Sequence, residues 1–389
     1  MMQKHSAFDG DEKRIAYIGT YPPRECGIAN FTKDLINATE QFQEIRPSIV
    51  IALNEEGGAY NYDRRVKFQI ERDSIDDYIQ AADYVNLSEA NIVNLQHEFG
   101  LFGGRWGEYI NSFLEKLKKP VVTTLHTILP NFESTAQEVF HGITNHTDAF
   151  VVMTRTALRL LKNHKIGQHK LNVIPHGCPD VSFVATKRPK ASLGLKGRIV
   201  LSTFGLINRG KGIHHAIRAL PFIVEKEPRI LYLIIGETHP EVRRIEGERY
   251  RKRLIRLVDK LKLRKHVRFH NRFLSKRELI RYLQATDIYI TPYIDRNQVS
   301  SGTLVYALGT GKSIISTRYL HAEEALADGR GLLCKFRNPV SIAECINRLL
   351  EDQEQRFRFA RKAYDYSRGF TWSKVAEEYV RLFNRLLKD

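Results

Sequence analysis

The stretch from Asp295 to Thr317 combines residue types that could bind an anion or a sugar. Its pattern predicts a loop, a short helix, a glycine-rich turn and a buried strand. The helix is expected to begin in a small-polar run, Ser300, Ser301, Gly302 and Thr303. Unpaired backbone N–H groups and hydroxyls at a helix N-terminus suit a phosphate or a sugar hydroxyl. This stretch is therefore the first candidate for a binding site.

Residues 309–313, Gly-Thr-Gly-Lys-Ser, resemble the end of an ATP-binding P-loop. That motif needs a glycine six positions before its lysine, and Tyr306 stands there. A P-loop also runs from a strand into a helix, whereas Lys312 leads from a predicted helix into a predicted strand. The sequence thus argues against ATP hydrolysis at this segment.

Three more loops follow predicted strands. Gly27 precedes a helix and permits close approach of a ligand to the backbone, although a simple turn glycine is the alternative. His126 comes directly after the strand at 120–125, and its alternative is a buried, structural histidine. The loop 205–212 holds Gly205, Arg209 and Lys211. Glycines and cations before a helix predict that Lys211 binds a diphosphate, with Arg209 assisting.

These loops need a scaffold of alternating strands and helices. Strands are predicted at 14–19, 48–53, 91–95, 120–125, 149–153 and 172–174. Residues 178–198 lack periodicity and are interpreted as a linker. The pattern then restarts, with strands at 199–204, 230–235, 267–269, 288–291, 313–316 and 332–334. This alternation predicts an α/β fold with two doubly wound parallel sheets, whose ligands bind at the carboxyl ends of the strands.

Length and charge limit the remaining possibilities. The 389 residues suit about two domains. The net charge is +17, and many of the cations fall between Arg243 and Arg277 around a helical apolar pattern that includes Leu254 and Val258. The pattern predicts a solvated basic face, and contact with an anionic membrane is the alternative. Nucleic-acid binding is disfavoured because no aromatic-interleaved basic module accompanies the charge.

Targeting and redox signals are also weak. No apolar run reaches the ~20 residues of a membrane-spanning helix, and the first residues show no secretory signal. Cys26, Cys178, Cys334 and Cys345 lie far apart, so neither a zinc site nor a disulfide framework is indicated. We expect a cytoplasmic protein, with a peripheral membrane location as the alternative.

Six loose motifs together resemble a known family. They are Gly27, residues 124–126 (Thr-Leu-His), 173–177 (Val-Ile-Pro-His-Gly), Gly205 with Lys211-Gly212, 306–312 (Tyr-Ala-Leu-Gly-Thr-Gly-Lys) and 370–372 (Phe-Thr-Trp). Their order over nearly the whole chain is similar to that in glycosyltransferase family 4. The resemblance implies the GT-B fold, two Rossmann-like domains that face each other across a central cleft. It also implies sugar transfer from a nucleotide donor with retention of configuration, without a metal or other cofactor.

The resemblance divides the chain and assigns roles. It implies an N-terminal acceptor domain at 1–185, joined by a final helix at 371–389, and a nucleotide-sugar donor domain at 190–370. His126 matches the family histidine beside the donor sugar. Lys211 matches the lysine that holds the donor phosphates, and Gly27 matches the loop glycine near them. A cation there would stabilise the charge that develops on the leaving diphosphate.

The sequence departs from the family pattern around the donor. The family arginine before the lysine falls at Leu206, so Arg209 is expected to replace it. The two family glutamates fall at Gln298 and Tyr306. Gln298 can still hydrogen-bond a sugar and Tyr306 can stack, but neither carries charge. Asp295 could enter the site instead.

Two further groups follow strands. Residues 96–104 contain His97, Glu98 and Gly103, which we interpret as acceptor-binding, against a structural glycine loop. Glu324 matches a glutamate that is common in the family, and helix capping is its alternative role.

The leading hypothesis is a retaining glycosyltransferase. It would move a hexose of mannose or glucose type from a GDP- or UDP-linked donor to a glycan or a lipid-linked acceptor. One alternative is a retaining phosphorylase or sugar-phosphate-dependent enzyme, and another is a non-catalytic glycan-binding subunit. A dinucleotide-dependent oxidoreductase is disfavoured because neither strand-loop-helix start contains G-x-G-x-x-G.

Overall fold

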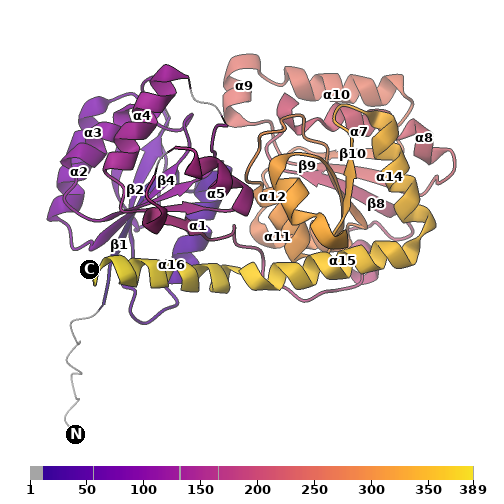
Figure 1. Ribbon diagram of the computed structural model, residues 1–389. Coiled ribbons are helices and arrows are strands. Elements are labelled where there is room, and N and C mark those ends of the chain that lie inside the picture. The colour runs from indigo at the N-terminus through magenta and orange to yellow at the C-terminus, as the bar shows by residue number, and fades with distance from the viewer. Residues whose placement is uncertain (1–11, 56, 131–132, 165, 389) are drawn as a thin grey trace, which may run out of the picture. The chain divides into compact units, whose positions relative to one another are not determined.

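The computed structural model describes residues 12–55, 57–130, 133–164 and 166–388. The chain divides into two compact units, each built on its own sheet (Figure 1). Unit 1 takes in the described residues up to Met153, residues 157–175 and the described residues from Ser373 onward. Unit 2 takes in Thr154–Thr156 and His176–Trp372.

Unit 1 contains a seven-stranded sheet in the order β3-β2-β1-β4-β5-β6-β7, with every pair parallel. The strands are β1 (Ile15–Gly19), β2 (Ile49–Asn54), β3 (Val66–Glu71), β4 (Ile92–His97), β5 (Val121–Leu125), β6 (Ala149–Val152) and β7 (Leu171–Val173). Strands β1, β2, β4, β5 and β6 are buried along their whole length. Burial on both faces explains why their sequences are nearly continuous apolar runs.

Helices connect most of these strands, as is usual for parallel pairing, although no helix lies between β2 and β3 in the described residues. The helices are α1 (Gly27–Thr39), α2 (Ile75–Leu87), α3 (Tyr109–Lys116), α4 (Ser134–Asn145) and α5 (Arg155–Lys162), with a short 3-10 turn at Arg105–Gly107. The final helix, α16 (Trp372–Leu386), also belongs to unit 1 from Ser373 onward.

Unit 2 contains a six-stranded parallel sheet in the order β10-β9-β8-β11-β12-β13. The strands are β8 (Ile199–Phe204), β9 (Ile230–Ile235), β10 (Val267–His270), β11 (Ile288–Thr291), β12 (Ser313–Thr317) and β13 (Leu332–Cys334). Its helices are α6 (Lys187–Ser192), α7 (Ile213–Ala219), α8 (Pro221–Val224), α9 (Pro240–Glu246), α10 (Arg249–Lys260), α11 (Lys276–Ala285), α12 (Gly302–Gly309), α13 (Leu320–Ala325), α14 (Pro339–Glu351) and α15 (Gln353–Ser367).

Both sheets confirm the predicted α/β class, and each reverses its strand order at one place. In unit 1 the first strand, β1, pairs with β2 on one side and β4 on the other. In unit 2 the first strand, β8, pairs with β9 and β11. Loops that follow the two strands at such a switch point diverge, which opens room for a ligand beyond the strand ends. The loops after β1 and β4, and those after β8 and β11, therefore become the candidate binding segments.

Two local predictions need correction. The edge strand β3 was missed, and only Ile70 in it is fully buried. Residues 178–198 are not a loose linker, because Cys178 and Leu195 are buried in unit 2 and Phe183 packs edge-on against Tyr364. After β8, the helical segment is divided into α7 and α8 at Pro221, where a proline cannot donate to the preceding turn.

The C-terminal helix is attached to the sheet of unit 1 by polar as well as apolar contacts. Val375, Tyr379 and Phe383 recur at helical spacing and are buried. The hydroxyl of Tyr379 hydrogen-bonds that of Thr124 in β5 at 2.9 Å. Farther along, the Arg385 guanidinium donates to Asn172 Oδ1 at 2.8 Å.

Removing the buried Tyr379 hydroxyl should weaken this attachment. We expect Tyr379→Phe to lower the free energy of unfolding by about 1 kcal/mol, because a buried hydrogen bond is lost while the ring packing stays. The half-exposed Tyr366 provides the control, and Tyr366→Phe should have little effect. Equal thermal unfolding midpoints for the Tyr379 variant and the parent would contradict the prediction.

Candidate active site

The strongest cluster of predicted residues in unit 2 surrounds Lys211, in the loop that follows β8. Its ammonium donates to the hydroxyl of Tyr293, just after β11, at 2.7 Å and lies 4.1 Å from the centre of the same ring. The Tyr293 hydroxyl also hydrogen-bonds Thr303 Oγ1 at 2.6 Å. Among the described residues no carboxylate pairs with Lys211. Since its partner is neutral, the positive charge of Lys211 is not cancelled locally.

The start of α12 supplies small polar groups to the same cluster. Ser301 caps the helix, with its side chain accepting from the N–H of Leu304 at 3.4 Å, and hydrogen-bonds Thr303 at 3.2 Å. The N–H of Ser301 donates to His321 Nδ1 at 2.8 Å. Burial lowers the pKa of His321 to about 4. The imidazole is therefore neutral at pH 7 and can accept this bond.

Two glycines allow the side chains of this cluster to pack closely against the backbone. Gly205 has φ of +120°, and a Cβ there would lie 3.2 Å from Thr303 Cγ2 and 3.8 Å from Lys211 Nζ. Gly302 packs against His176, since an added Cβ would lie 2.7 Å from its Nε2 atom. The structure thus brings together Gly205, Lys211, Ser301 and Thr303, at the switch point between β8 and β11. Their combination of one cation, hydroxyls and a helix N-terminus suits a diphosphate.

Three other predicted donor residues are engaged differently. The Arg209 guanidinium pairs with Glu246 of α9 at 2.8 Å, so the structure does not direct it to the Lys211 cluster. The Gln298 amide donates to the Ser300 carbonyl at 2.9 Å, which stabilises the loop before α12. Tyr306 is half-buried, with its ring centre 6.2 Å from that of Phe204.

Asp295 lies in the same loop as Gln298. Its side chain is exposed and accepts from the N–H of Asn297 at 2.9 Å. This is a local turn contact, and it does not reach the Lys211 cluster.

In unit 1, His126 lies at the end of a chain of buried polar side chains. Its Nε2 atom is 2.8 Å from Gln96 Oε1, and Gln96 Nε2 donates to Asn94 Oδ1 at 2.5 Å. Asn94 Nδ2 donates to the Val122 carbonyl at 3.0 Å and lies 3.3 Å from Thr124 Oγ1. Thr124 in turn contacts Tyr379 of α16. The chain therefore connects the C-terminal helix to His126.

This chain of hydrogen bonds fixes the tautomer of His126. A backbone carbonyl can only accept, so the Asn94 amide must present its nitrogen to Val122 and its oxygen to Gln96. Gln96 must then present its nitrogen to Asn94 and its oxygen to His126. The proton of a neutral His126 ring must accordingly be on Nε2. In that tautomer the lone pair of the ring is on Nδ1.

The other predicted residues of unit 1 have different surroundings. Gly27 is exposed at the first position of α1, and a Cβ there would meet no atom within 4 Å. Glu98 accepts hydrogen bonds from the Thr127 hydroxyl and from the backbone of Phe99 and Gly100, while burial raises its pKa. Its carboxylate supports the loop between β4 and the following turn.

Two of the acceptor predictions fall on residues that are enclosed by protein. His97 is completely buried, and neither ring nitrogen has a hydrogen-bond partner among the described residues. Burial lowers its pKa to about 3, so the ring is neutral. Gly103 is buried as well, and a Cβ there would lie 1.9 Å from the Arg72 carbonyl oxygen. The side chain of His97 is therefore not presented to a ligand in this structure, and Gly103 has a packing role.

Glu324 caps the start of a helix. Its two carboxylate oxygens accept from the backbone N–H groups of Arg155 at 2.9 Å and Thr156 at 2.8 Å. A carboxylate at a helix N-terminus is stabilising because it meets unpaired donors and the positive end of the helix dipole. The capping role that was the alternative for Glu324 is the one this structure displays.

The P-loop-like residues are structural. Helix α12 ends at Gly309 and β12 begins at Ser313, which is the reverse of the P-loop order. Lys312 is buried, and its ammonium lies 3.4 Å from the Gln284 carbonyl. The nearby Asp287 pairs with Lys190 at 2.5 Å. Lys312 therefore has no route to a phosphate in this conformation.

Sequence reasoning missed Tyr293, the partner of Lys211. Its position two residues after β11, at the strand end that adjoins β8, is the signal that would have identified it. Within the described residues, no group of three or more His, Cys, Asp or Glu side chains is placed to hold a metal ion. In that same part of the chain, no helix combines the length and apolarity needed to cross a bilayer.

Comparison with known proteins finds similarity to one family over part of the chain. Residues 185–366, which include the Lys211 cluster, match the family model described as glycosyl transferases group 1. The D-inositol 3-phosphate glycosyltransferase of Corynebacterium urealyticum is 27% identical over 207 residues, 52% of this chain and 47% of that protein. The chain thus spans about half the length of the first curated relatives that it matches, 47% and 46%.

Solved structures share the fold. HepE of Anabaena, in complex with UDP and glucose, has a TM-score of 0.76 at 14% identity, covering 96% of this chain and 100% of that one. Sucrose-phosphate synthase of Thermosynechococcus elongatus has a TM-score of 0.77 at 16% identity, covering 97% and 100%. The likeness shows the GT-B fold, two Rossmann-like domains with parallel sheets. The family match over residues 185–366 supports a glycosyltransferase of group 1.

Burial of Lys312 should make stability depend on pH. Desolvation lowers its pKa from the ordinary 10.5 to about 8. Between these values the unfolded chain binds the proton more tightly, so the contribution of Lys312 to the free energy of unfolding rises with pH. At pH 7 the buried charge costs roughly 1–3 kcal/mol. We expect Lys312→Met to raise the free energy of unfolding at pH 7, and the difference from the parent to shrink between pH 8 and 10.5.

The control for this experiment is Lys252→Met, since Lys252 is exposed on α10. Urea titrations at pH 7 and near pH 10 would measure both variants. A Lys312→Met protein that is less stable than the parent at pH 7, with the Lys252 variant unchanged, would contradict the prediction.

Proposed function

We propose that the protein is a retaining glycosyltransferase of family 4, which transfers a hexose of mannose or glucose type from a nucleotide sugar to a glycan or lipid-linked acceptor. The observation that carries this proposal is the convergence of Gly205, Lys211, Ser301 and Thr303 at the switch point of unit 2. It is supported by the group 1 match over the same unit, and by the UDP and glucose bound in HepE.

The chemistry follows from the charges of this cluster. Breaking the bond between the sugar and the nucleotide leaves negative charge on the diphosphate. The ammonium of Lys211 and the N-terminus of α12 would stabilise that charge, which grows in the transition state. A lysine can do this without a metal, so we propose a metal-independent reaction with the nucleotide sugar as the only activated substrate.

His126 is proposed to contact the donor sugar. Its position at the end of β5 and the bond between its Nε2 atom and Gln96 Oε1, at 2.8 Å, fix the ring. A ring held in one tautomer and orientation binds without the entropic cost of being ordered. Gln298 and Tyr306 stand where the family has glutamates, so we propose a branch in which the donor is held without these two carboxylates.

Nucleotide binding is the direct test. Thermal unfolding would be followed with GDP, UDP, ADP or inorganic phosphate present. We expect GDP or UDP to raise the midpoint, since a ligand at 100 times its Kd stabilises the folded state by about 2.7 kcal/mol. Stabilisation by phosphate but by no nucleotide would favour a phosphorylase. Glycan binding without turnover would favour a non-catalytic subunit.

Two substitutions test the assigned roles. With a nucleotide sugar that the parent turns over, Lys211→Ala and His126→Ala should each reduce kcat by roughly 100-fold or more, the usual cost of removing a group that stabilises transition-state charge. The matched controls are the exposed Lys226→Ala and His146→Ala, which should retain parental rates. Retention of the parental rate by the Lys211 variant would refute its role.

An anionic membrane is the partner that the basic face of α10 would suit, and we propose a peripheral contact there. Lys252, Arg253 and Arg256 are exposed, and Ile255 between them is 38% exposed. No carboxylate among the described residues pairs with these three cations. Each such cation near an anionic surface contributes about 1 kcal/mol.

Co-sedimentation with vesicles tests this contact. We expect binding to phosphatidylglycerol vesicles at low salt but not to phosphatidylcholine vesicles, and a marked loss with Lys252→Glu/Arg256→Glu. The control variant, Lys67→Glu/Lys118→Glu, changes the net charge equally at exposed positions of unit 1. If the parent does not sediment with anionic vesicles at low salt, the basic face is only a solvated surface.

A further inference from the structure

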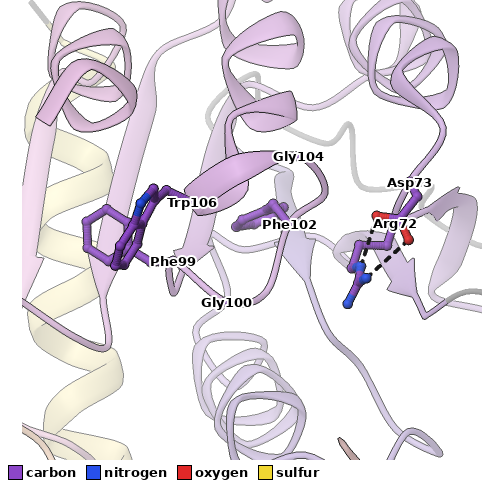
Figure 2. Close-up of a pocket in the computed structure, with 7 residues that line it drawn as sticks. All are labelled: Arg72, Asp73, Phe99, Gly100, Phe102, Gly104 and Trp106. Carbon is purple, nitrogen blue, oxygen red and sulfur yellow. Dashed lines mark hydrogen bonds and ion pairs between the residues drawn. The ribbon is translucent and has the colours of Figure 1, made fainter. Parts of the chain in front are cut away.

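Unit 1 contains a pocket beyond the carboxyl ends of β3 and β4 (Figure 2). Its volume is about 270 Å³, and it is lined by Arg72, Asp73, Phe99, Gly100, Phe102, Gly104 and Trp106. This is close to the lower limit of about 300 Å³ for pockets that hold drug-sized ligands. The pocket therefore suits a small ligand of about one ring.

One side of the pocket is aromatic. Phe99 and Trp106 meet edge to face, with ring centres 6.1 Å apart. In Figure 2, Phe102 lies between this pair and the charged residues on the other side. Behind the aromatic side, the buried His97 stacks on Phe102 at 6.0 Å and meets Phe99 edge to face at 4.9 Å. The rings are thus fixed by packing before any ligand arrives.

Trp106 is held in a strained backbone conformation. Its φ and ψ are 57° and 20°, in the left-handed region that a bulky side chain rarely adopts. The surrounding turn imposes this conformation, since Gly104 and Gly107 on either side have φ of 79° and 81°. Such strain persists only where the surrounding structure over-determines it, and it is concentrated at functional sites. Here it places an indole that is only partly buried against the pocket.

The other side of the pocket is charged but electrically balanced. Arg72 Nε and Nη2 donate to the two carboxylate oxygens of Asp73 at 3.2 and 3.1 Å. The Arg72 carbonyl accepts from the Tyr78 hydroxyl at 2.9 Å, and that hydroxyl accepts from the N–H of Gly103 at 3.0 Å. This connection fixes the Arg72 backbone against the glycine turn. The pocket consequently offers donors and acceptors at a fixed place with no net charge.

We propose that this pocket binds one neutral sugar ring of the acceptor, an inference that rests on the proposed function. The apolar face of a pyranose would pack on the indole and phenyl rings, while its hydroxyls would donate to Asp73 and accept from Arg72. A phosphate would gain no net attraction here, because the charge of Asp73 cancels that of Arg72. A neutral hexose satisfies both sides of the pocket.

The position of the pocket agrees with an acceptor role. The backbone N–H of His126 donates to the His97 carbonyl at 3.0 Å, and the Thr127 hydroxyl donates to Glu98. The aromatic rings that line the pocket enclose His97. The pocket and His126 are therefore built on the ends of the adjacent strands β4 and β5. A sugar in the pocket would lie near the histidine that we assign to the transfer.

The chain offers an internal reporter, because it contains two tryptophans, Trp106 and Trp372. In a Trp372→Phe background, Trp106 fluorescence would be titrated with methyl α-D-glucoside, methyl α-D-mannoside and glucose 6-phosphate. We expect a saturable change with at least one neutral glycoside, and about tenfold weaker binding of glucose 6-phosphate. Arg72→Ala should weaken glycoside binding about tenfold, as expected for loss of one charge-assisted hydrogen bond.

Two further variants sharpen the test. Asp73→Asn leaves the charge of Arg72 unbalanced, so it should shift the preference toward glucose 6-phosphate. The matched control is Arg229→Ala, since Arg229 forms the same two-bond pair with Glu227 in unit 2 and its loss should leave the titration unchanged. Circular dichroism would confirm that each variant folds, and the conservative Asp73→Asn result decides the charge argument if Arg72→Ala does not fold.

The outcomes separate this inference from the proposed function. Stabilisation by a nucleotide with no saturable glycoside response at Trp106 overturns the pocket assignment and leaves the function intact. A glycoside response that Arg72→Ala and Asp73→Asn do not alter also overturns it. A glycoside response with the expected variants, but without stabilisation by any nucleotide, keeps the sugar site and refutes the transferase.

Discussion

Pairing of the first strand of each sheet with the fourth determines where ligands can bind in both units. Parallel strands direct all their carboxyl ends to one edge, and the reversal of strand order between β1 and β4, and between β8 and β11, separates the loops there. Lys211 and Tyr293 meet because they follow β8 and β11, which are adjacent in the sheet. The Thr203 hydroxyl of β8 donates a hydrogen bond to the Ile290 carbonyl of β11, although these two residues are 87 positions apart in the sequence. The chemistry of unit 2 depends on that adjacency.

In unit 1 the same geometry works through buried polar side chains. Asn94 and Gln96 are two residues apart and lie on the same face of β4. Because this strand is completely buried, their amides must find partners inside the protein. The Val122 carbonyl fixes the direction of the first amide, and every later bond up to His126 follows from it. A satisfied chain of this kind stabilises a unique arrangement, whereas a partly satisfied one would be costly. The orientation of His126 is thus determined by residues that no ligand touches.

Sequence reasoning predicted most of the scaffold because buried parallel strands are continuous apolar runs. Every strand of unit 2 was predicted, since each lies between helices and leaves few alternatives. The edge strand β3 was missed even though its sequence, Val-Lys-Phe-Gln-Ile-Glu, alternates apolar and polar residues. That pattern is typical of a half-exposed strand, and attention to buried runs overlooked it. The segment at 178–198 was interpreted as a linker because it is basic, contains proline and has no periodic apolar pattern. The few residues that it buries could not be recognised from that composition.

Prediction of the candidate site was more uneven, for a physical reason. Lys211, Ser301 and Thr303 were predicted from loop position, which the fold determines. Whether a side chain faces a ligand or the core depends on its neighbours, and a single sequence does not contain them. His97 is enclosed by Phe99 and Phe102, and Arg209 has Glu246 within reach. Such pairings depend on contacts between different helices, strands and loops. The sequence could therefore identify His97 and Arg209 as candidates, but it could not predict which residues surround them.

The two candidate sites differ in the partner of their cationic side chain, and this difference bears on the ligand proposed for each. Lys211 is held by a phenol, which orders the ammonium by a hydrogen bond and by the face of its ring but leaves its charge intact. Arg72 is held by Asp73, which orders the guanidinium and neutralises it. In the proposed roles, the first arrangement would attract a diphosphate, whereas the second would give one no net attraction and would keep hydrogen-bond capacity for hydroxyls. A transferase needs both properties, a charged place for the leaving group and a neutral place for the sugar that receives it.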